Sequence, residues 1–547
     1  MPRVPSSQHP TNNPPRQQTR PVTPEPQARK RAARTPTPGQ RRPSQRQRTY
    51  SSSTDASLPS LSDLLSPSPE LKPIVVQLEE EDIYNISSPI RHFIPPPTMD
   101  EIFKPTPIQP VQLTQSTQPI QPTYLARPTQ RTQQETTLKQ AHQEALAPIL
   151  HKPLVQSLIA FSKVYIPEKK LHARQANLFT TTAGRLAQAF IQNPREKTLF
   201  HFLILPRILG LGLTRGQLAQ TLKDFPTVIP DPIQEDRTDQ GQPKEQDPVD
   251  RARKLLEKGF IGRATQALLN PTSLVQETPD TLQTLYQKHP LGSAAPFNNT
   301  NPRPGQAITV EAIQNAVRSI NKEKAAGLSG WTRPLLDIAT STTNSPVLAM
   351  LRLLTDMIRQ GTAPGQDLLC ASRLIGLEKP EGGVRPIAVG DLIYRVAYKA
   401  ILTSTFQKDM LLPNQLGVNS PGGVEPIIFL LEEAIQGDNK EGYKNMASLD
   451  LSNAFNSISR RSISAAVATY APTLYRATRW AYNQPSLLIT STGATLASSE
   501  GVRQGDPLAP LLFSLAIRPT LEHLQQTLPR ATIIAYLDDI YILSKDN

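Results

Sequence analysis

Three aspartates lie in segments whose surroundings suit metal-dependent chemistry. Asp450 follows the apolar start of MASLDLSNAFNSI, and Asp538 and Asp539 lie between the two apolar runs of ATIIAYLDDIYILS. Adjacent carboxylates repel each other and are costly to desolvate unless cations neutralise them. Magnesium ions prefer oxygen ligands, which can come from distant parts of a chain. These side chains are therefore candidates for a two-metal nucleotidyl-transfer site, although a lone aspartate pair would more simply be a solvated turn.

The flanking residues predict the elements that position these carboxylates. Residues 446–451 are predicted to form a buried strand that carries Asp450 near its end, followed by a helix. The β-branched and apolar runs on either side of residues 537–539 predict a hairpin with an acidic tip. Strand ends and hairpin tips can bring carboxylates together from distant parts of the sequence.

The order of these motifs resembles the palm of reverse transcriptases from non-LTR (LINE-like) retrotransposons. Asp450 comes first, GVRQGDPLAPLLFSLAI follows, and YLDD comes last. The resemblance implies that Asp450 and Asp538 ligate the metals and that Asp539 is a companion carboxylate. It also implies two Mg²⁺ ions as cofactors, with Mn²⁺ as a substitute.

Segments further upstream resemble the fingers of the same enzymes. They are KAAGLSGWT, LIGLEKPEGGVRPIAVGDLIYRVAYKAIL and NQLGVNSPGGVEPI. Lys379 and Arg385 flank a turn at residues 380–383, so both side chains could face one cleft. They are candidate triphosphate contacts because a guanidinium can bridge two phosphate oxygens, although charges on a surface hairpin would look the same.

The resemblance also assigns residues that would select the substrate. Phe455, five residues after the first aspartate, corresponds to a ring that blocks a ribose 2′ hydroxyl, although a core phenylalanine would look identical. Gln504 and Gly505 resemble positions that contact the incoming nucleotide and let the template approach. Asp506 and Pro507 are expected to open the following helix.

Composition narrows the class of partner. The net charge of +13 favours a polyanion, with nucleic acid as the leading candidate. Cys370 is the only cysteine, which excludes an intramolecular disulfide and a cysteine-based zinc finger, and its apolar surroundings predict burial. There is no run of about 18 apolar residues and no apolar signal core. We therefore expect no membrane partner and no secretion, but a nuclear or cytoplasmic location in a eukaryotic host.

The N-terminal part is expected to differ from the rest. Proline accounts for 55 of 547 residues and is concentrated towards the N-terminus, so residues 1–137 are predicted to be disordered, basic then acidic, and rich in Pro and Gln. Basic residues at 29–48 predict a nuclear-import or nucleic-acid-binding arm, against a featureless solvated tail. The segment IVVQLEEED resembles a SUMO-interacting motif, with Val75 to Leu78 as the added strand, against a bland linker.

The remaining segments predict an α/β chain with a right-hand polymerase fold. Helical spacing predicts a helical region at 138–229, a linker at 230–248 and a helical extension at 249–300. Residues 301–547 are predicted to form the fingers and a partial palm, with an antiparallel palm sheet and helices. By the resemblance, the sequence ends before a thumb.

The resemblance implies an RNA-directed DNA polymerase that uses an RNA template, a DNA primer and dNTPs. A truncated nucleic-acid-binding remnant without catalysis is the main alternative. An RNA-dependent RNA polymerase shares the two-aspartate palm, but Phe455 and YLDD argue against it.

Overall fold

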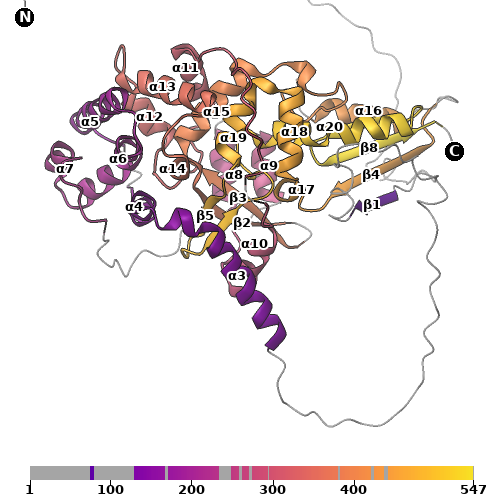
Figure 1. Cartoon of the computed structure of the whole chain (residues 1–547), viewed down its shortest axis with the longest axis horizontal. Helices are drawn as coiled ribbons and strands as arrows, with labels where there is room; N and C mark the ends of the chain where they lie inside the picture. The colour runs from indigo at the N-terminus through magenta and orange to yellow at the C-terminus, as the bar shows by residue number, and fades with distance from the viewer. Residues whose placement is uncertain are drawn as a thin grey trace, which may run out of the picture. The chain divides into compact units, whose positions relative to one another are not determined.

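The computed structural model describes residues 74–78, 129–166, 170–232, 248–257, 261–269, 274–293, 295–379, 382–420, 424–436 and 442–545. Figure 1 draws the helices and strands along the chain. The basic segment 29–48 lies outside the described residues, as does most of the segment predicted to be disordered. The exceptions are strand β1 (Ile74–Leu78) and the start of helix α3, which begins at Thr129, ahead of the predicted boundary at 138.

The upstream helices share a core with the helices that follow them. Buried Phe179, Ala183, Leu186 and Phe190 recur at three- and four-residue intervals along α5, which gives it one apolar face. Helix α5 packs against α6, α7, α12 (Arg333–Ala339) and α13 (Pro346–Gln360), so this region is part of the larger fold. The upstream helices are α3 (Thr129–Leu150), α4 (Pro153–Ser162), α5 (Ala173–Gln192), α6 (Glu196–Thr214) and α7 (Leu218–Asp224).

Helix α6 is apolar because it lies in the core. Within the described part of the chain it is the one helix long and apolar enough to cross a membrane, and 78% of that stretch is buried inside the structure. Arg207, in the same helix, is buried and donates hydrogen bonds to the carbonyl oxygens of Val164 (2.6 Å) and Leu328 (3.0 Å). The indole N–H of Trp331 donates to the Phe202 carbonyl at 3.1 Å. These contacts fix the upstream helices to the segment that contains KAAGLSGWT.

Short helices fill the predicted extension. Helices α8 (Pro248–Glu257) and α9 (Ile261–Leu269) pack against each other around Ala252, Ala264 and Ala267. Helix α10 (Pro279–Gln287) packs instead against α3 and against strand β3 (Val384–Gly390). The extension therefore reaches the sheet that carries Arg385.

Sheet B has the strand order β3-β2-β5-β6. Strands β2 (Ser372–Glu378) and β3 (Val384–Gly390) form an antiparallel hairpin, β5 (Ser486–Ile489) runs parallel to β2, and β6 (Thr495–Ser498) pairs antiparallel with β5. The hairpin turn contains Gly382 and Gly383 at φ +89° and +91°, a conformation that suits glycine.

Sheet B is accompanied by the helices of the predicted fingers. Cys370 ends α14, and burial raises the pKa of its thiol to about 12, so the prediction of a buried cysteine is confirmed. The helices are α11 (Val310–Ser319), α12 (Arg333–Ala339), α13 (Pro346–Gln360), α14 (Gln366–Cys370), α15 (Leu392–Thr405) and the 3₁₀ turn η1 (Lys408–Met410).

Sheet A has the strand order β1-β4-β8-β7. Strands β4 (Asn445–Leu451), β8 (Asp539–Ser544) and β7 (Thr532–Tyr536) pair antiparallel, as predicted. Strand β1 adds parallel to β4, with Gln77 opposite Asp450. The segment that resembles a SUMO-interacting motif thus pairs here with its own chain, and its use by a SUMO-type partner stays a prediction.

Helices accompany sheet A as well. Helix α20 packs against α18 and β7. Leu511, Leu512, Phe513 and Leu515 on α20 are buried, which explains the apolar run after GVRQGDP. The helices are α16 (Glu425–Gln436), α17 (Ala454–Ser457), α18 (Arg460–Tyr470), the 3₁₀ turn η2 (Pro472–Leu474), α19 (Tyr475–Tyr482) and α20 (Ala509–Thr527).

Candidate active site

The strand register of sheet A brings the three aspartates together. Asp450 and Asp539 are direct partners across the antiparallel pair β4 and β8. In such pairs the Cβ atoms lie about 4.5–5.5 Å apart. Asp538 lies in the tight turn between β7 and β8, where Leu537 has φ +58°. Residues distant in sequence thus form one acidic cluster at one end of the sheet.

The electrostatics of the cluster favour binding of a cation. Burial raises the pKa of the Asp538 carboxyl and the charge of Asp450 raises it further, whereas Arg385 and Lys379 lower it. Burial also raises the pKa of Asp539, with the charges of Asp538 and Asp450 adding to the effect. The carboxyl groups of Asp538 and Asp539 therefore resist ionisation unless positive charge is supplied.

The aspartate carboxylates fit a magnesium ion that is bound partly by the protein and partly by the substrate. Among the residues the structure describes, no three His, Cys, Asp or Glu side chains form a ready-made metal cage. Magnesium does not need one, because it is commonly held by one or two carboxylates, with waters and substrate phosphates completing its shell. Asp450 and Asp538 can supply such carboxylates from two adjoining elements.

Lys379 and Arg385 lie on the β2–β3 hairpin of sheet B. The Lys379 N–H donates to the Gly383 carbonyl at 3.1 Å and closes the turn, and Arg385 pairs with Leu377 in the hairpin register. Both cations act on the pKa of Asp538, so the hairpin lies close to the acidic cluster. Carboxylates and cations together form a site suited to a metal-bound polyphosphate.

Lys288 is a further cation near this site that sequence reasoning did not identify. Burial lowers its pKa, and the charge of Lys379 lowers it further. The Asn453 side-chain amide donates to the Lys288 carbonyl at 3.0 Å, which ties the end of α10 to the turn after β4. No motif marks Lys288, because only the fold brings it near Lys379.

Phe455 lies in α17, directly after the turn that follows β4. Its half-buried ring stacks on the buried ring of Phe513, with centroids 4.9 Å apart and planes at 9°. Its carbonyl accepts a hydrogen bond from the Val502 N–H at 2.6 Å. The ring is therefore held in one plane, with part of its surface exposed.

Gln504 and Gly505 lie in the loop between β6 and α20. The Ala388 N–H donates to the Gln504 carbonyl at 2.8 Å, which attaches this loop to β3, the strand that carries Arg385. Gly505 has φ +109°, and a Cβ atom there would lie 2.5 Å from the Ala388 carbonyl oxygen. A larger residue at this position would separate the loop from the strand.

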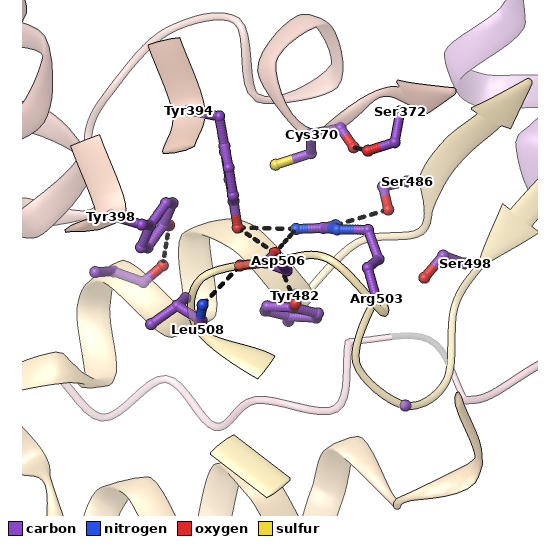
Figure 2. A network of polar contacts seen from close by, with 12 residues as sticks. Cys370, Ser372, Tyr394, Tyr398, Tyr482, Ser486, Ser498, Arg503, Asp506 and Leu508 are labelled. Carbon is purple, nitrogen blue, oxygen red and sulfur yellow. Dashed lines mark hydrogen bonds and ion pairs between the residues drawn. The ribbon is translucent and has the colours of Figure 1, made fainter. Parts of the chain in front are cut away.

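A buried polar network that sequence reasoning missed surrounds this loop. Figure 2 shows Arg503 and Asp506, which form hydrogen bonds with Tyr394, Tyr482 and Ser486. Only Asp506 was singled out from the sequence, as a residue opening the next helix; it precedes α20 and accepts a hydrogen bond from the Leu508 N–H at 2.9 Å.

Comparison with known proteins gives consistent matches. Residues 377–547 match the family model described as reverse transcriptase (RNA-dependent DNA polymerase). The chain is 34% identical over 256 residues to the retrotransposable element SLACS 132 kDa protein of Trypanosoma brucei gambiense. The alignment covers 42% of this chain and 20% of that protein. The chain is also 24% identical over 304 residues to the transposon TX1 uncharacterized 149 kDa protein of Xenopus laevis. This alignment covers 51% of this chain and 22% of that protein. The matched region spans about one fifth of the length of each relative.

Proposed function

We propose that this chain extends a DNA primer with dNTPs along an RNA template. The proposal starts from the finding that residues 377–547 form a reverse transcriptase domain of the non-LTR retrotransposon type. The observation that carries the proposal is the register that sets Asp450 opposite Asp539, with Asp538 in the adjoining turn. A domain of this family generally uses divalent metal ions and acts on a nucleic-acid template, a primer and nucleotides.

In this proposal Asp450 and Asp538 hold two Mg²⁺ ions, for which Mn²⁺ can substitute, and Asp539 supports them. The bound ions would activate the primer 3′ hydroxyl and neutralise the triphosphate. Burial and the charge of Asp450 raise the pKa of Asp538, and this supports the assignment because a bound cation would stabilise the ionised carboxylate.

The neighbouring residues bind and select the nucleotide. Lys379 and Arg385 contact the triphosphate. This assignment is supported by their positive charges, both of which lower the pKa of Asp538. Gln504 and Gly505 contact the incoming nucleotide and leave room for the template. The Phe455 ring excludes a ribose 2′ hydroxyl, which would make the enzyme a DNA polymerase.

The alternative is a chain that binds nucleic acid without extending a primer. The matched region is about one fifth of each relative's length, so primer extension by this chain is a proposal. The net charge of +13 supports nucleic-acid binding under either function.

Primer extension by the chain on an RNA template distinguishes the two functions. We expect magnesium-dependent incorporation of dNTPs, reduced by roughly 10³-fold or more in Asp538→Asn because electrostatic stabilisation of the transferring phosphoryl group is lost. Exposed Asp409→Asn is the matched control and should keep wild-type activity. Tight binding of the primer–template without extension would support the alternative, and full activity in Asp538→Asn would contradict the assigned site.

A further inference from the structure

The buried ion pair of Arg503 and Asp506 encloses the two loop residues assigned to the nucleotide. Their side chains are 3% and 1% exposed, and Arg503 Nη2 lies 2.6 Å from Asp506 Oδ2. We propose that this pair, with Tyr394, Tyr482 and Ser486, is a positioning network that holds Gln504 and Gly505 in place for the incoming nucleotide. The proposal rests on the proposed function and adds residues that act through the loop.

Asp506 is hydrogen-bonded from several sides. Its Oδ2 atom accepts hydrogen bonds from the hydroxyls of Tyr394 (2.7 Å) and Tyr482 (2.8 Å) in addition to Arg503. Its Oδ1 atom accepts from the Leu508 N–H at 2.9 Å. Tyr394 lies in α15, Tyr482 ends α19 and Leu508 precedes α20, so the carboxylate is tied to all three elements.

Arg503 is tied to the same helices and also to sheet B. Its Nη1 atom donates to Ser486 Oγ on β5 at 2.8 Å, and its Nη2 atom donates to the Tyr394 hydroxyl at 2.8 Å. Its guanidinium carbon lies 4.6 Å from the ring centroid of Tyr482 and 5.4 Å from that of Tyr394. Hydrogen bonds and cation–π contacts therefore fix its orientation.

The network acts on the loop because the two charges flank it directly. Gln504 and Gly505 are the residues between the ions, and the loop lies against Ala388 on β3. Strand β3 also carries Arg385. Fixing the loop therefore fixes Gln504 relative to a candidate triphosphate contact. Nucleotide binding gains from such preorganisation, because less conformational entropy is lost when the loop is already ordered.

Stability alone is a weak reason for a pair of this kind. Removing two charges from water is costly, and well-packed apolar residues often stabilise a fold as well as a buried ion pair does, or better. What apolar replacements cannot provide is the directional contact of Asp506 with two hydroxyls, a guanidinium and a backbone N–H. The geometry of the network therefore points to positioning.

Tyrosine-to-phenylalanine variants test the network with little change in volume. Tyr394→Phe and Tyr482→Phe each remove one donor to Asp506. The matched control is Tyr398→Phe, because the Tyr398 hydroxyl is also buried but donates to the Ala477 carbonyl at 2.8 Å, outside the network. The measurements are the Kd of the chain for a fluorescent dNTP with Mg²⁺, the thermal melt, and hydrogen–deuterium exchange of residues 503–508.

We expect the dNTP Kd to rise about fivefold in Tyr394→Phe and Tyr482→Phe, with faster exchange in the loop. Tyr398→Phe should keep the wild-type Kd and loop exchange, whatever its melting temperature. Equal losses of melting temperature in all three variants, with unchanged Kd and loop exchange, would overturn the positioning role. A wild-type chain that binds no dNTP with Mg²⁺ would instead overturn the proposed function, and the inference with it.

Discussion

At Phe455 a single ring would separate a DNA polymerase from an RNA polymerase. The stack on Phe513 holds the ring in one plane while part of it stays exposed, so a bulky group beside it would meet a fixed obstacle. A clash that arises only when the triphosphate is aligned for attack affects kcat/KM. The stack also explains why the sequence left two interpretations open, since the same ring contributes to the core.

Phe455→Val should therefore leave dNTP use largely intact and raise rNTP incorporation by at least roughly tenfold, about 1.4 kcal/mol. A plain core phenylalanine would behave differently, because its truncation leaves a cavity that costs up to several kcal/mol of stability. Measuring kcat/KM for both nucleotides beside a thermal melt decides between them. Equal loss of dNTP and rNTP incorporation would remove Phe455 from the substrate site.

The candidate carboxylates could be predicted from sequence, but several of their neighbours could not. Asp450 and Asp538 lie in apolar strand patterns with turn residues beside them, so local chemistry marks both. Tyr394, Tyr482 and Lys288 lie in segments that carry no acidic motif, and folding brings them to the site from elsewhere in the sequence. Single-sequence patterns do not record such tertiary contacts.

Among the elements, two buried histidines lie where α3, α10 and β6 meet. The ring of His142 on α3 accepts a hydrogen bond from the Ala497 N–H of β6 at 3.1 Å and packs on Tyr286 of α10, with ring centroids 5.0 Å apart. His289, just after α10, bonds through Nδ1 to the Leu285 carbonyl at 2.7 Å. Burial lowers the pKa of His289 to about 4, with the charges of His142 and Lys288 adding to the effect. Burial lowers the pKa of His142 as well, so the folded junction favours the neutral form of both histidine rings.

Acid should weaken this junction. The pKa of His289 is about 4 in the fold and about 6.5 in the unfolded chain, so its contribution is present above pH 6.5 and is lost as the pH falls towards 4. We expect the free energy of unfolding to fall by about 2 kcal/mol from this residue between pH 7 and pH 5. His289→Gln, which cannot gain a proton, should show a smaller loss in denaturant titrations at the two pH values. The same loss in both proteins would contradict the assignment.

Secondary structure was predictable where periodicity was strong. The hairpin of β7 and β8 follows from two β-branched runs, and the helices of residues 138–229 follow from apolar spacing. The pairing of β1 with β4 was not predictable, because an edge strand selects its partner by tertiary context. The antiparallel order of the other strands of sheet A agrees with the predicted fold class.

For the whole molecule, the positive charge predicts how nucleic acid binds. Basic residues at 29–48 lie outside the described residues, so the proposal that they bind phosphates rests on the sequence alone. Deleting residues 1–50 should reduce the slope of log affinity against log salt, by about 0.7 for each phosphate that the arm neutralises on a single strand. A deletion of equal length within residues 79–128 is the control. An unchanged slope after the first deletion would show that the arm does not bind nucleic acid.

The central claim is that Asp450 and Asp538 hold divalent metal ions, and metal-directed cleavage of the chain tests it without depending on polymerase activity. Iron(II) bound in place of magnesium generates hydroxyl radicals that cut the backbone nearby when ascorbate and peroxide are added. We predict cuts near residues 450 and 538, because carboxylate oxygens at these positions would hold the iron. Excess Mg²⁺ should suppress these cuts. The variants Asp450→Asn and Asp538→Asn should abolish them, and Asp409→Asn should leave them unchanged. Cuts of equal strength in all three variants, or cuts confined to other parts of the chain, would contradict the account.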